Sequence, residues 1–286
     1  MERTILNTIR ALDTSDGAGV RLKRALGYNP MVRLDPFLML DAFSSDNPDD
    51  YIAGFPPHPH RGFETVTYLM EGHMKHRDHL CNEGDLQQGG VQWMTAGRGI
   101  IHEEMPQQQD GLLRGFQLWI NLPAAEKMKA AGYRDITDTE IPRLDLPKGG
   151  QIKAIAGEVT IGNQVISAPV KGGSTDPLYL DVKLRADETV TVPLTQGYNA
   201  FLYLFEGQVS IAGEAVKSDH LATFTDGDKV SLVAGDHGAR LLLLAGKPIG
   251  EPIAQYGPFV MNTRDEINQA LSDYRDGTLT AEPSSL

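Results

Sequence analysis

GFPPHPHRGFE, residues 54–64, places two histidines, His58 and His60, on either side of a proline. Successive side chains of a β-strand point to opposite faces, so residues two positions apart share a face. If this segment is a strand, both imidazoles point into the same cavity. The first candidate site of the chain is therefore a pair of histidines on one strand.

A second segment, GRGIIHEE at residues 97–104, offers the same spacing with His102 and Glu104. Glu103 then faces the other way, so we take Glu104 as the acidic ligand. If the two strands lie together, they predict a metal site made of three histidines and one carboxylate.

The types of ligand in this set limit which metals could bind. Imidazole and carboxylate together suit iron, manganese, cobalt, nickel, copper or zinc. A closed structural zinc site usually contains thiolates, and neither motif contains a cysteine. Four protein ligands also leave one or two positions open on a five- or six-coordinate metal, where a substrate oxygen or O2 could bind.

Glu64 is a rival acidic ligand. By strand alternation it shares a face with His58 and His60, so the spacing alone does not exclude it. We expect it to support the ligands rather than to bind the metal.

Three further histidines, His73, His76 and His79, are spaced by three residues. On a strand this spacing puts His76 opposite the other two, so we expect a solvated hairpin rather than a second metal site. Cys81 is the single cysteine, which excludes an intramolecular disulfide, and we expect it to be a small apolar filler.

Many short apolar segments are separated by glycine-containing turns, which is typical of antiparallel sandwiches and barrels. The second half repeats part of the first, because YLMEG at 68–72 has an echo in YLFEG at 203–207. No His-x-His precedes the second copy. We therefore predict an all-β fold of two similar barrels, the second without a metal site.

Two helices are expected. Residues 123–132 begin with proline and end with glycine, which indicates a short helix. Thr263 and Glu266 fit a capping box, followed by apolar residues at helical spacing up to Tyr274. We place the domain boundary in the turn-rich segment 133–150, giving an N-terminal metal-binding domain at 1–140 and a C-terminal domain at 141–286.

Three longer segments resemble a known family. HPHRGFETVTYLMEG (58–72), QWMTAGRGIIHEEMP (92–106) and GPFVMNT (257–263) are similar to the wording of the pirin family, in the same order along the chain. The resemblance implies a bicupin fold and a metal, most often iron, held by His58, His60, His102 and Glu104.

The same resemblance implies an activity. Several pirin-like proteins are quercetin 2,3-dioxygenases, which cleave a flavonol with O2 and release carbon monoxide. Glu104 would then also be catalytic, as the acceptor of the substrate's hydroxyl proton. The alternative that the resemblance implies is an iron-dependent redox sensor that binds and regulates a transcription factor or a metabolic enzyme.

Bulk properties exclude other classes. The net charge of -12 repels polyanions, so we expect no direct binding to nucleic acid. No apolar run is long enough to cross a membrane, and the N-terminal residues lack the core of a signal peptide. We expect a cytoplasmic monomer, also nuclear if the source is eukaryotic, whose partners are a flavonol-like small molecule, O2 and, in the alternative, a regulatory protein.

Overall fold

The computed structural model describes residues 1–29 and 32–281. The chain forms two compact units, and each contains segments from distant parts of the sequence. We call them the histidine unit (Asp13–Leu22, Leu38–Asp138 and Ile249–Leu286) and the aliphatic unit (Met1–Leu12, Lys23–Phe37 and Thr139–Pro248).

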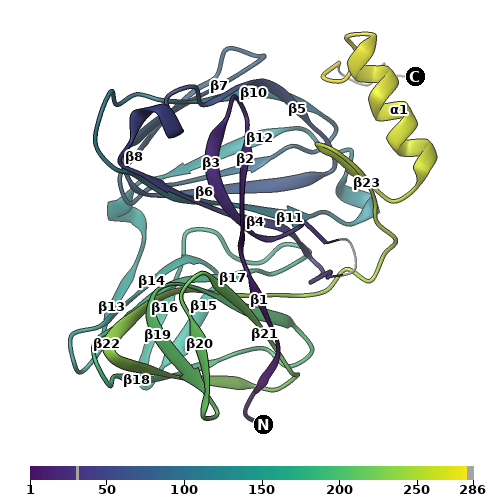
Figure 1. The fold of residues 1–286 in the computed structure, drawn as a ribbon. Coiled ribbons are helices and arrows are strands. Elements are labelled where there is room, and N and C mark those ends of the chain that lie inside the picture. The colour runs from purple at the N-terminus through teal and green to yellow at the C-terminus, as the bar shows by residue number, and fades with distance from the viewer. Residues whose placement is uncertain (30–31, 282–286) are drawn as a thin grey trace. The chain divides into compact units, whose positions relative to one another are not determined.

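The histidine unit is built around two antiparallel sheets (Figure 1). The larger one has seven strands in the order β12 (Gly132–Ile136), β9 (Val91–Thr95), β6 (Phe63–Glu71), β11 (Leu113–Asn121), β4 (Phe37–Ser45), β3 (Val20–Leu26) and β2 (Leu12–Asp16). The smaller one has four, in the order β5 (Phe55–His60), β10 (Ile100–Pro106), β7 (His73–Asp78) and β8 (Glu83–Gln87). A two-stranded ribbon follows near the C-terminus, made of β23 (Ala254–Tyr256) and β24 (Phe259–Met261).

The aliphatic unit contains a nine-stranded antiparallel sheet. Its main path runs through β1 (Ile5–Arg10), β21 (His220–Phe224), β19 (Asn199–Ile211), β22 (Lys229–Gly246), β17 (Leu178–Leu184), β14 (Gln151–Ala156) and β13 (Arg143–Asp145). Two strands branch from it, β18 (Thr189–Pro193) on β22 and β20 (Glu214–Lys217) on β19, and a separate hairpin is formed by β15 (Glu158–Ile161) and β16 (Gln164–Ser167). The expected all-β architecture of two antiparallel barrels is confirmed.

The units differ from the division at residue 140 in both terminal segments and in Lys23–Phe37, which also belongs to the aliphatic unit. Residues Met1–Leu12 belong to the aliphatic unit, which otherwise comes mainly from the second half of the chain. Ile249–Leu286 belong to the histidine unit, which otherwise comes mainly from the first half. The cause at the N-terminus is pairing, because β1 forms the edge strand beside β21.

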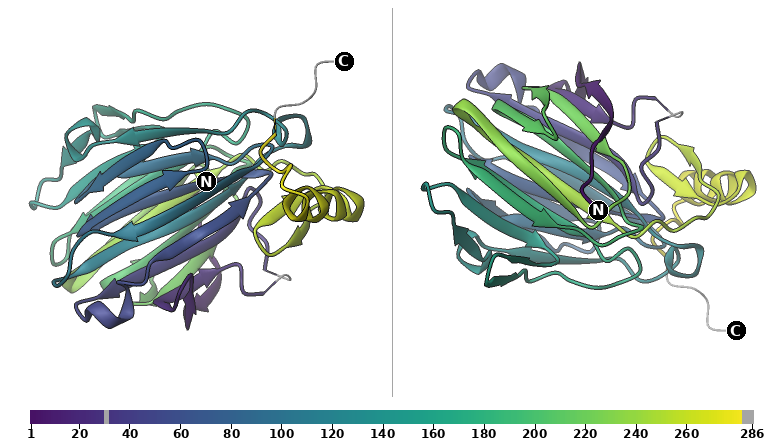
Figure 2. Two further views of the ribbon diagram at one scale, coloured as in Figure 1. Left: turned by 90° about the horizontal axis from the view of Figure 1, so that it is seen from above. Right: turned by 90° about the horizontal axis from the view of Figure 1, so that it is seen from below.

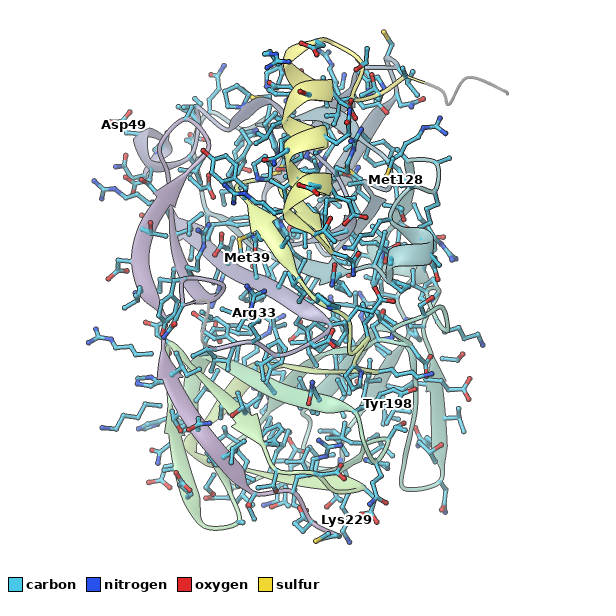
Figure 3. The ribbon with its side chains drawn as sticks, turned by 90° about the vertical axis from the view of Figure 1, so that its right-hand side faces the viewer. Arg33, Met39, Asp49, Met128, Tyr198 and Lys229 are labelled. Atoms are coloured by element: carbon cyan, nitrogen blue, oxygen red, sulfur yellow. The ribbon has the colours of Figure 1, made fainter. Side chains whose placement is uncertain are left out.

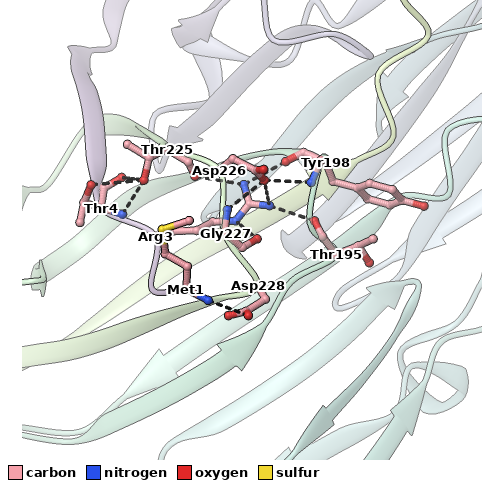
Figure 4. A network of polar contacts seen from close by, with 10 residues as sticks. Met1, Arg3, Thr4, Thr195, Tyr198, Thr225, Asp226, Gly227 and Asp228 are labelled. Carbon is pink, nitrogen blue, oxygen red and sulfur yellow. Dashed lines mark hydrogen bonds and ion pairs between the residues drawn. The ribbon is translucent and has the colours of Figure 1, made fainter.

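Arg3 fixes the N-terminal segment in the aliphatic unit (Figure 4). Its side chain is 1% exposed and donates to the backbone carbonyls of Gly227, Tyr198 and Thr195 at 2.9–3.0 Å. The guanidinium also lies 3.6 Å from the carboxylate of Asp226. These hydrogen bonds and the nearby carboxylate compensate the buried charge, so Arg3 anchors the segment that precedes β1.

The helix expected at 123–132 is not formed. Only Ala124–Glu126 make a short 3-10 turn, η2, and a strand begins at Gly132. Lys127 is buried, whereas its neighbour Met128 is 53% exposed. Met128 is labelled in Figure 3. A helix at 123–132 would place Lys127 on its solvated face. Because the Lys127 ammonium is buried instead, tertiary contacts override the local helix pattern.

The C-terminal helix is confirmed as α1 (Arg264–Arg275). Thr263 accepts from the backbone of Glu266, and the Glu266 carboxylate accepts from the backbone of Thr263, which completes the capping box. Ile267 and Ala270 are buried on one face. Figure 2 shows α1 beside the strands rather than between them. Within residues 1–29 and 32–281, no helix is both long and apolar enough to span a membrane.

Two smaller 3-10 turns complete the elements, η1 (Pro48–Asp50) and η3 (Asp138–Glu140).

Candidate metal centre

The pairing of β5 with β10 brings the histidines together. His58 lies directly opposite His102, and His60 lies opposite Ile100. The ring centroids are 4.4 Å apart for His58 and His102, 4.7 Å for His58 and His60, and 5.0 Å for His60 and His102. One nitrogen from each ring lies within 4.8 Å of the other two, which is close enough for all three to hold one metal ion.

Several ring nitrogens of this cluster lack hydrogen-bond partners in the described part of the chain. His60 Nδ1 and both nitrogens of His102 are buried without a hydrogen bond among the described residues. His58 Nδ1 lies 2.9 Å from the carbonyl of Pro56, which favours the tautomer that leaves Nε2 free. Buried polar atoms normally have partners, so this cluster fits an added metal ion.

Two of the three histidines, His60 and His102, are held in the neutral form. Burial lowers the pKa of His60 and of His102 well below the usual value, and neighbouring imidazoles lower both further. Neutral imidazole is the form that donates a lone pair to a metal. These two residues therefore release few protons when a metal binds at neutral pH.

Glu104 lies in the same sheet but in a second group. Its side chain is buried, as expected from the shared face with His102, and one carboxylate oxygen groups with His102 and His76 within 4.8 Å. Glu104 Oε1 lies 3.6 Å from His76 Nδ1 and 3.3 Å from Thr67 Oγ1. The two groups of candidate ligands share His102, and Glu104 joins the three-histidine group through it.

His76 is the residue that the sequence reasoning misplaced. The spacing correctly predicts that it faces away from His73, but the face it occupies is the interior, where it is 1% exposed. The signal was present in the neighbouring residue: Met74 shares a face with His76, and an apolar Met74 marks that face as buried.

Glu64 does not approach the cluster. Its carboxylate accepts from the Trp93 indole at 3.1 Å and from Thr95 at 2.7 Å. The alternation argument fails because β5 ends at His60 and β6 begins at Phe63, in another sheet.

Gly62 makes that break. Its φ is +91°, and a side-chain carbon there would lie 2.0 Å from the carbonyl of Val260. Both the backbone angle and the space therefore require glycine.

The three long motifs meet beside the cluster. Gly62 N–H donates to the Gly97 carbonyl at 2.8 Å, and Val260 N–H donates to the Arg61 carbonyl at 3.0 Å. The Arg61 side chain is 4% exposed, donates to the carbonyl of Arg98 and forms an ion pair of 2.6 Å with Asp273 on α1. Residues far apart in sequence thus fix the strand ends that carry the histidines.

Aromatic side chains cover one side of the cluster. Trp119 stands 5.3 Å from His60 and 4.4 Å from Phe63, measured between ring centroids. Of the wall candidates suggested by the sequence (Phe37, Met39, Trp93, Met94, Phe116 and Trp119), Trp119 is the one with a ring contact to a candidate ligand. Phe37 instead packs on Phe201 of the aliphatic unit.

The remaining motif residues lie on the outside. His73 is about half-exposed and pairs with Asp85. Cys81 is exposed, so it is not the apolar filler that was expected.

The aliphatic unit repeats the topology of the small sheet. The order β5-β10-β7-β8 has its counterpart in β18-β22-β19-β20. The Glu-Gly turn at 71–72 can be aligned with the one at 206–207. The strand pairing on either side then gives each candidate ligand an equivalent position in the aliphatic unit. These positions hold buried aliphatic residues: Val192 for His58, Leu194 for His60, Val230 for His102 and Leu232 for Glu104.

Comparison with known families gives matches in both halves. Residues 19–120 match the Pirin family model, and residues 179–280 match the Pirin C-terminal cupin domain.

Individual proteins match over nearly the full length. A Pseudomonas aeruginosa protein named "Putative quercetin 2,3-dioxygenase" is 51% identical over 280 residues, covering 97% of this chain and 98% of its own. Human Pirin is 39% identical over 276 residues, covering 94% of this chain and 91% of its own. A crystal structure titled quercetin 2,3-dioxygenase from Acinetobacter baumannii superposes with a TM-score of 0.90 at 31% identity, covering 98% of this chain and 99% of that one.

Proposed function

This chain belongs to the pirin family, and we propose that it is a metal-dependent dioxygenase that cleaves a flavonol such as quercetin with O2 and releases carbon monoxide. The observation that carries the proposal is the cluster of His58, His60 and His102, whose ring nitrogens converge, with His60 Nδ1 and both His102 nitrogens lacking hydrogen-bond partners among the described residues. The relatives named for quercetin dioxygenase activity support the choice of reaction.

The residues present fit a transition metal. His58, His60 and His102 would hold it, with Glu104 completing the set, and this mixture of nitrogen and oxygen donors suits iron first and manganese, cobalt, nickel, copper or zinc as well. When bound, such a metal supplies Lewis-acid activation of a substrate hydroxyl and an electron path to O2.

Glu104 is the proposed proton acceptor. A flavonol must lose the proton of its 3-hydroxyl to become electron-rich enough to react with O2, and the buried Glu104 carboxylate, which groups with His102, is the carboxylate among the candidate ligands. Cleavage then breaks two carbon–carbon bonds of the heterocycle, and the carbon between them leaves as carbon monoxide.

The other residues of the site orient and shield. Trp119 and Phe63 present apolar rings next to His60, which favours a flat aromatic substrate and keeps water from the reacting carbons. Thr67 Oγ1 lies beside the carboxylate, 3.3 Å from Glu104 Oε1.

The test is reconstitution of metal-free protein with each of the six metals separately, followed by quercetin and O2. We expect quercetin consumption and carbon monoxide release with iron and with at least one further metal. Stoichiometric metal binding with no carbon monoxide from any metal would contradict the dioxygenase and would favour the regulatory alternative. A partner protein that binds the Fe(II) and Fe(III) forms differently would then support that alternative.

A further inference from the structure

We propose that His76 is a positioning residue of the metal centre, which holds the Glu104 carboxylate so that it can complete the ligand set. The proposal rests on the metal centre described above and extends it by one residue. Strand β7 pairs with β10, and His76 stands directly opposite Glu104 in that pairing. The backbone itself therefore places the imidazole beside the carboxylate.

The contact is between two buried polar groups. His76 is 1% exposed and Glu104 is 4% exposed, and His76 Nδ1 lies 3.6 Å from Glu104 Oε1. This separation is longer than a hydrogen bond, which is usually about 2.9–3.0 Å for N–H···O. Contacts of this kind often tighten only when a site is loaded, and a small rotation of either side chain closes the gap.

His76 has no other acceptor that would explain its burial. Both of its ring nitrogens are buried without a hydrogen-bond partner among the residues that the structure describes. An imidazole placed this way is costly unless it gains a partner. Glu104 offers one, because its Oε1 lies 3.6 Å from His76 Nδ1.

Glu104 in turn needs a donor. Thr67 Oγ1 is 3.3 Å from Glu104 Oε1 but only 2.6 Å from Gln117 Oε1, and a hydroxyl has one proton to give. With that proton directed to Gln117, His76 Nδ1–H is left to hold the carboxylate. A carboxylate fixed at one oxygen presents the other to a metal in a defined direction.

The far side of His76 borders a polar cavity. The cavity has a volume of about 270 Å³ and is lined by His76, Gln92, Tyr133 and Asp135 among others. The Gln92 amide is already bound to Asp135 at 2.9 Å. His76 therefore lines this cavity as well as contacting Glu104.

Three variants test which atom matters. His76→Phe keeps the ring volume and removes both nitrogens, His76→Asn keeps an amide nitrogen where Nδ1 stands, and His76→Gln moves it to the place of Nε2. In titrations of metal-free protein with Ni(II) or Co(II), we expect His76→Phe and His76→Gln to raise the dissociation constant about 10–100-fold, as loss of a residue that orients a ligand commonly does. His76→Asn is expected to stay within about threefold of wild type, because the donor is retained.

The matched control is His73→Phe, on the same strand but on the exposed face. It should bind metal as wild type does. Thermal unfolding of each metal-free variant shows that the fold is retained. Wild-type affinity in a folded His76→Phe protein would overturn the proposal, whereas failure of the wild type to bind metal would instead overturn the metal centre.

Pulsed EPR of the Cu(II)-loaded protein separates positioning from direct binding. We expect three coordinated imidazoles in the wild type and three in His76→Asn. Loss of one imidazole in that variant would overturn the positioning role, because His76 would then be a ligand itself.

Discussion

His60 and His102 are 3% and 2% exposed, yet His60 Nδ1 and both ring nitrogens of His102 have no hydrogen-bond partner within the described protein. A folded chain tolerates such groups where they serve a ligand or a reaction. Burial lowers the pKa of each ring and keeps it neutral, so the same burial that is costly for the fold prepares the lone pairs for a metal.

His58→Ala tests the residue scale. We expect the variant to lose metal and flavonol turnover together, with a dissociation constant raised more than about 100-fold, because a direct ligand contributes more than an orienting residue. Metal content after dialysis and carbon monoxide release measure the two effects. His79→Ala, outside the cluster, is the control, and turnover in a metal-free His58→Ala protein would contradict the proposed chemistry.

Strand alternation predicted the two pairs of candidate ligands but not the positions of Glu64 and His76. It placed His58 with His60 and His102 with Glu104, because side-chain period depends only on local backbone. It failed for Glu64, since Gly62 interrupts the strand with a φ of +91° that the letters alone do not reveal. For His76 it gave the right parity, but which face is interior is decided by sheet packing.

At the element scale, Arg61 ties the ends of β5, β10 and β24 to α1. Arg61→Met removes an ion pair and leaves two buried carbonyls without their donor, so we expect a loss of about 2–4 kcal/mol in the free energy of unfolding. Urea unfolding of the metal-free protein measures it. Arg77→Met, at a position that is 52% exposed, should change stability by less than about 0.5 kcal/mol. Equal effects of the two substitutions would show that Arg61 does not organise these elements.

Lys127 joins a second set of elements. Its ammonium donates to the carbonyl of Gly62 at 2.7 Å, to Asn121 Oδ1 at 2.6 Å and to the carbonyl of Val260 at 3.0 Å. Burial lowers its pKa from 10.5 to about 8, against the carboxylates of Glu251 and Glu266, which raise it. Above pH 8 the unfolded chain therefore binds more protons at this lysine than the folded chain does, and stability from this group rises with pH up to about 10.5.

Lys127→Met abolishes that dependence. We expect the free-energy difference between wild type and variant to favour the wild type by about 1–2 kcal/mol more at pH 9.5 than at pH 7. Urea unfolding at the two pH values gives the difference, and the other titrating groups cancel because both proteins share them. A difference that stays constant with pH would place the pKa of Lys127 at its ordinary value.

Element prediction succeeded where local signals act alone. The capping box of Thr263 and Glu266 fixed the start of α1, because both hydrogen bonds lie within one turn. The segment 123–132 carried helix signals at both ends and still became a single 3-10 turn. Two distant acceptors of Lys127, the carbonyls of Gly62 and Val260, compete with the helix there, and no local pattern contains them.

At the scale of the whole molecule, the same strand order occurs in both units but carries different side chains. The positions that hold His58, His60, His102 and Glu104 in one unit hold buried aliphatic side chains in the other. Valine and leucine offer no lone pairs to a metal. The aliphatic unit thus has the barrel and its apolar core but lacks the candidate metal ligands at these positions.

This asymmetry predicts one tightly bound metal ion per chain. Titration of the metal-free protein with Ni(II), with metal analysis after dialysis, measures the stoichiometry. We expect a ratio of one, reduced to none by His58→Ala. A second equivalent that survives His58→Ala would show that ligands lie elsewhere in the chain.

The sequence indicated the duplication, but the membership of the terminal segments required the structure. The echo between YLMEG and YLFEG is a local pattern and marks corresponding strands. The assignment of Met1–Leu12 to the aliphatic unit depends instead on the pairing of β1 with β21 and on Arg3, whose acceptors lie about 190–225 residues away along the chain. Composition of the segment carries no sign of such partners.

The most direct test of the central claim is the stoichiometry of carbon monoxide release by iron-reconstituted protein given quercetin and isotopically labelled O2. The account predicts one carbon monoxide for each quercetin consumed, with both labelled oxygen atoms in the reaction products, and no release by His58→Ala. Quercetin loss without carbon monoxide, or products without the label, would contradict it.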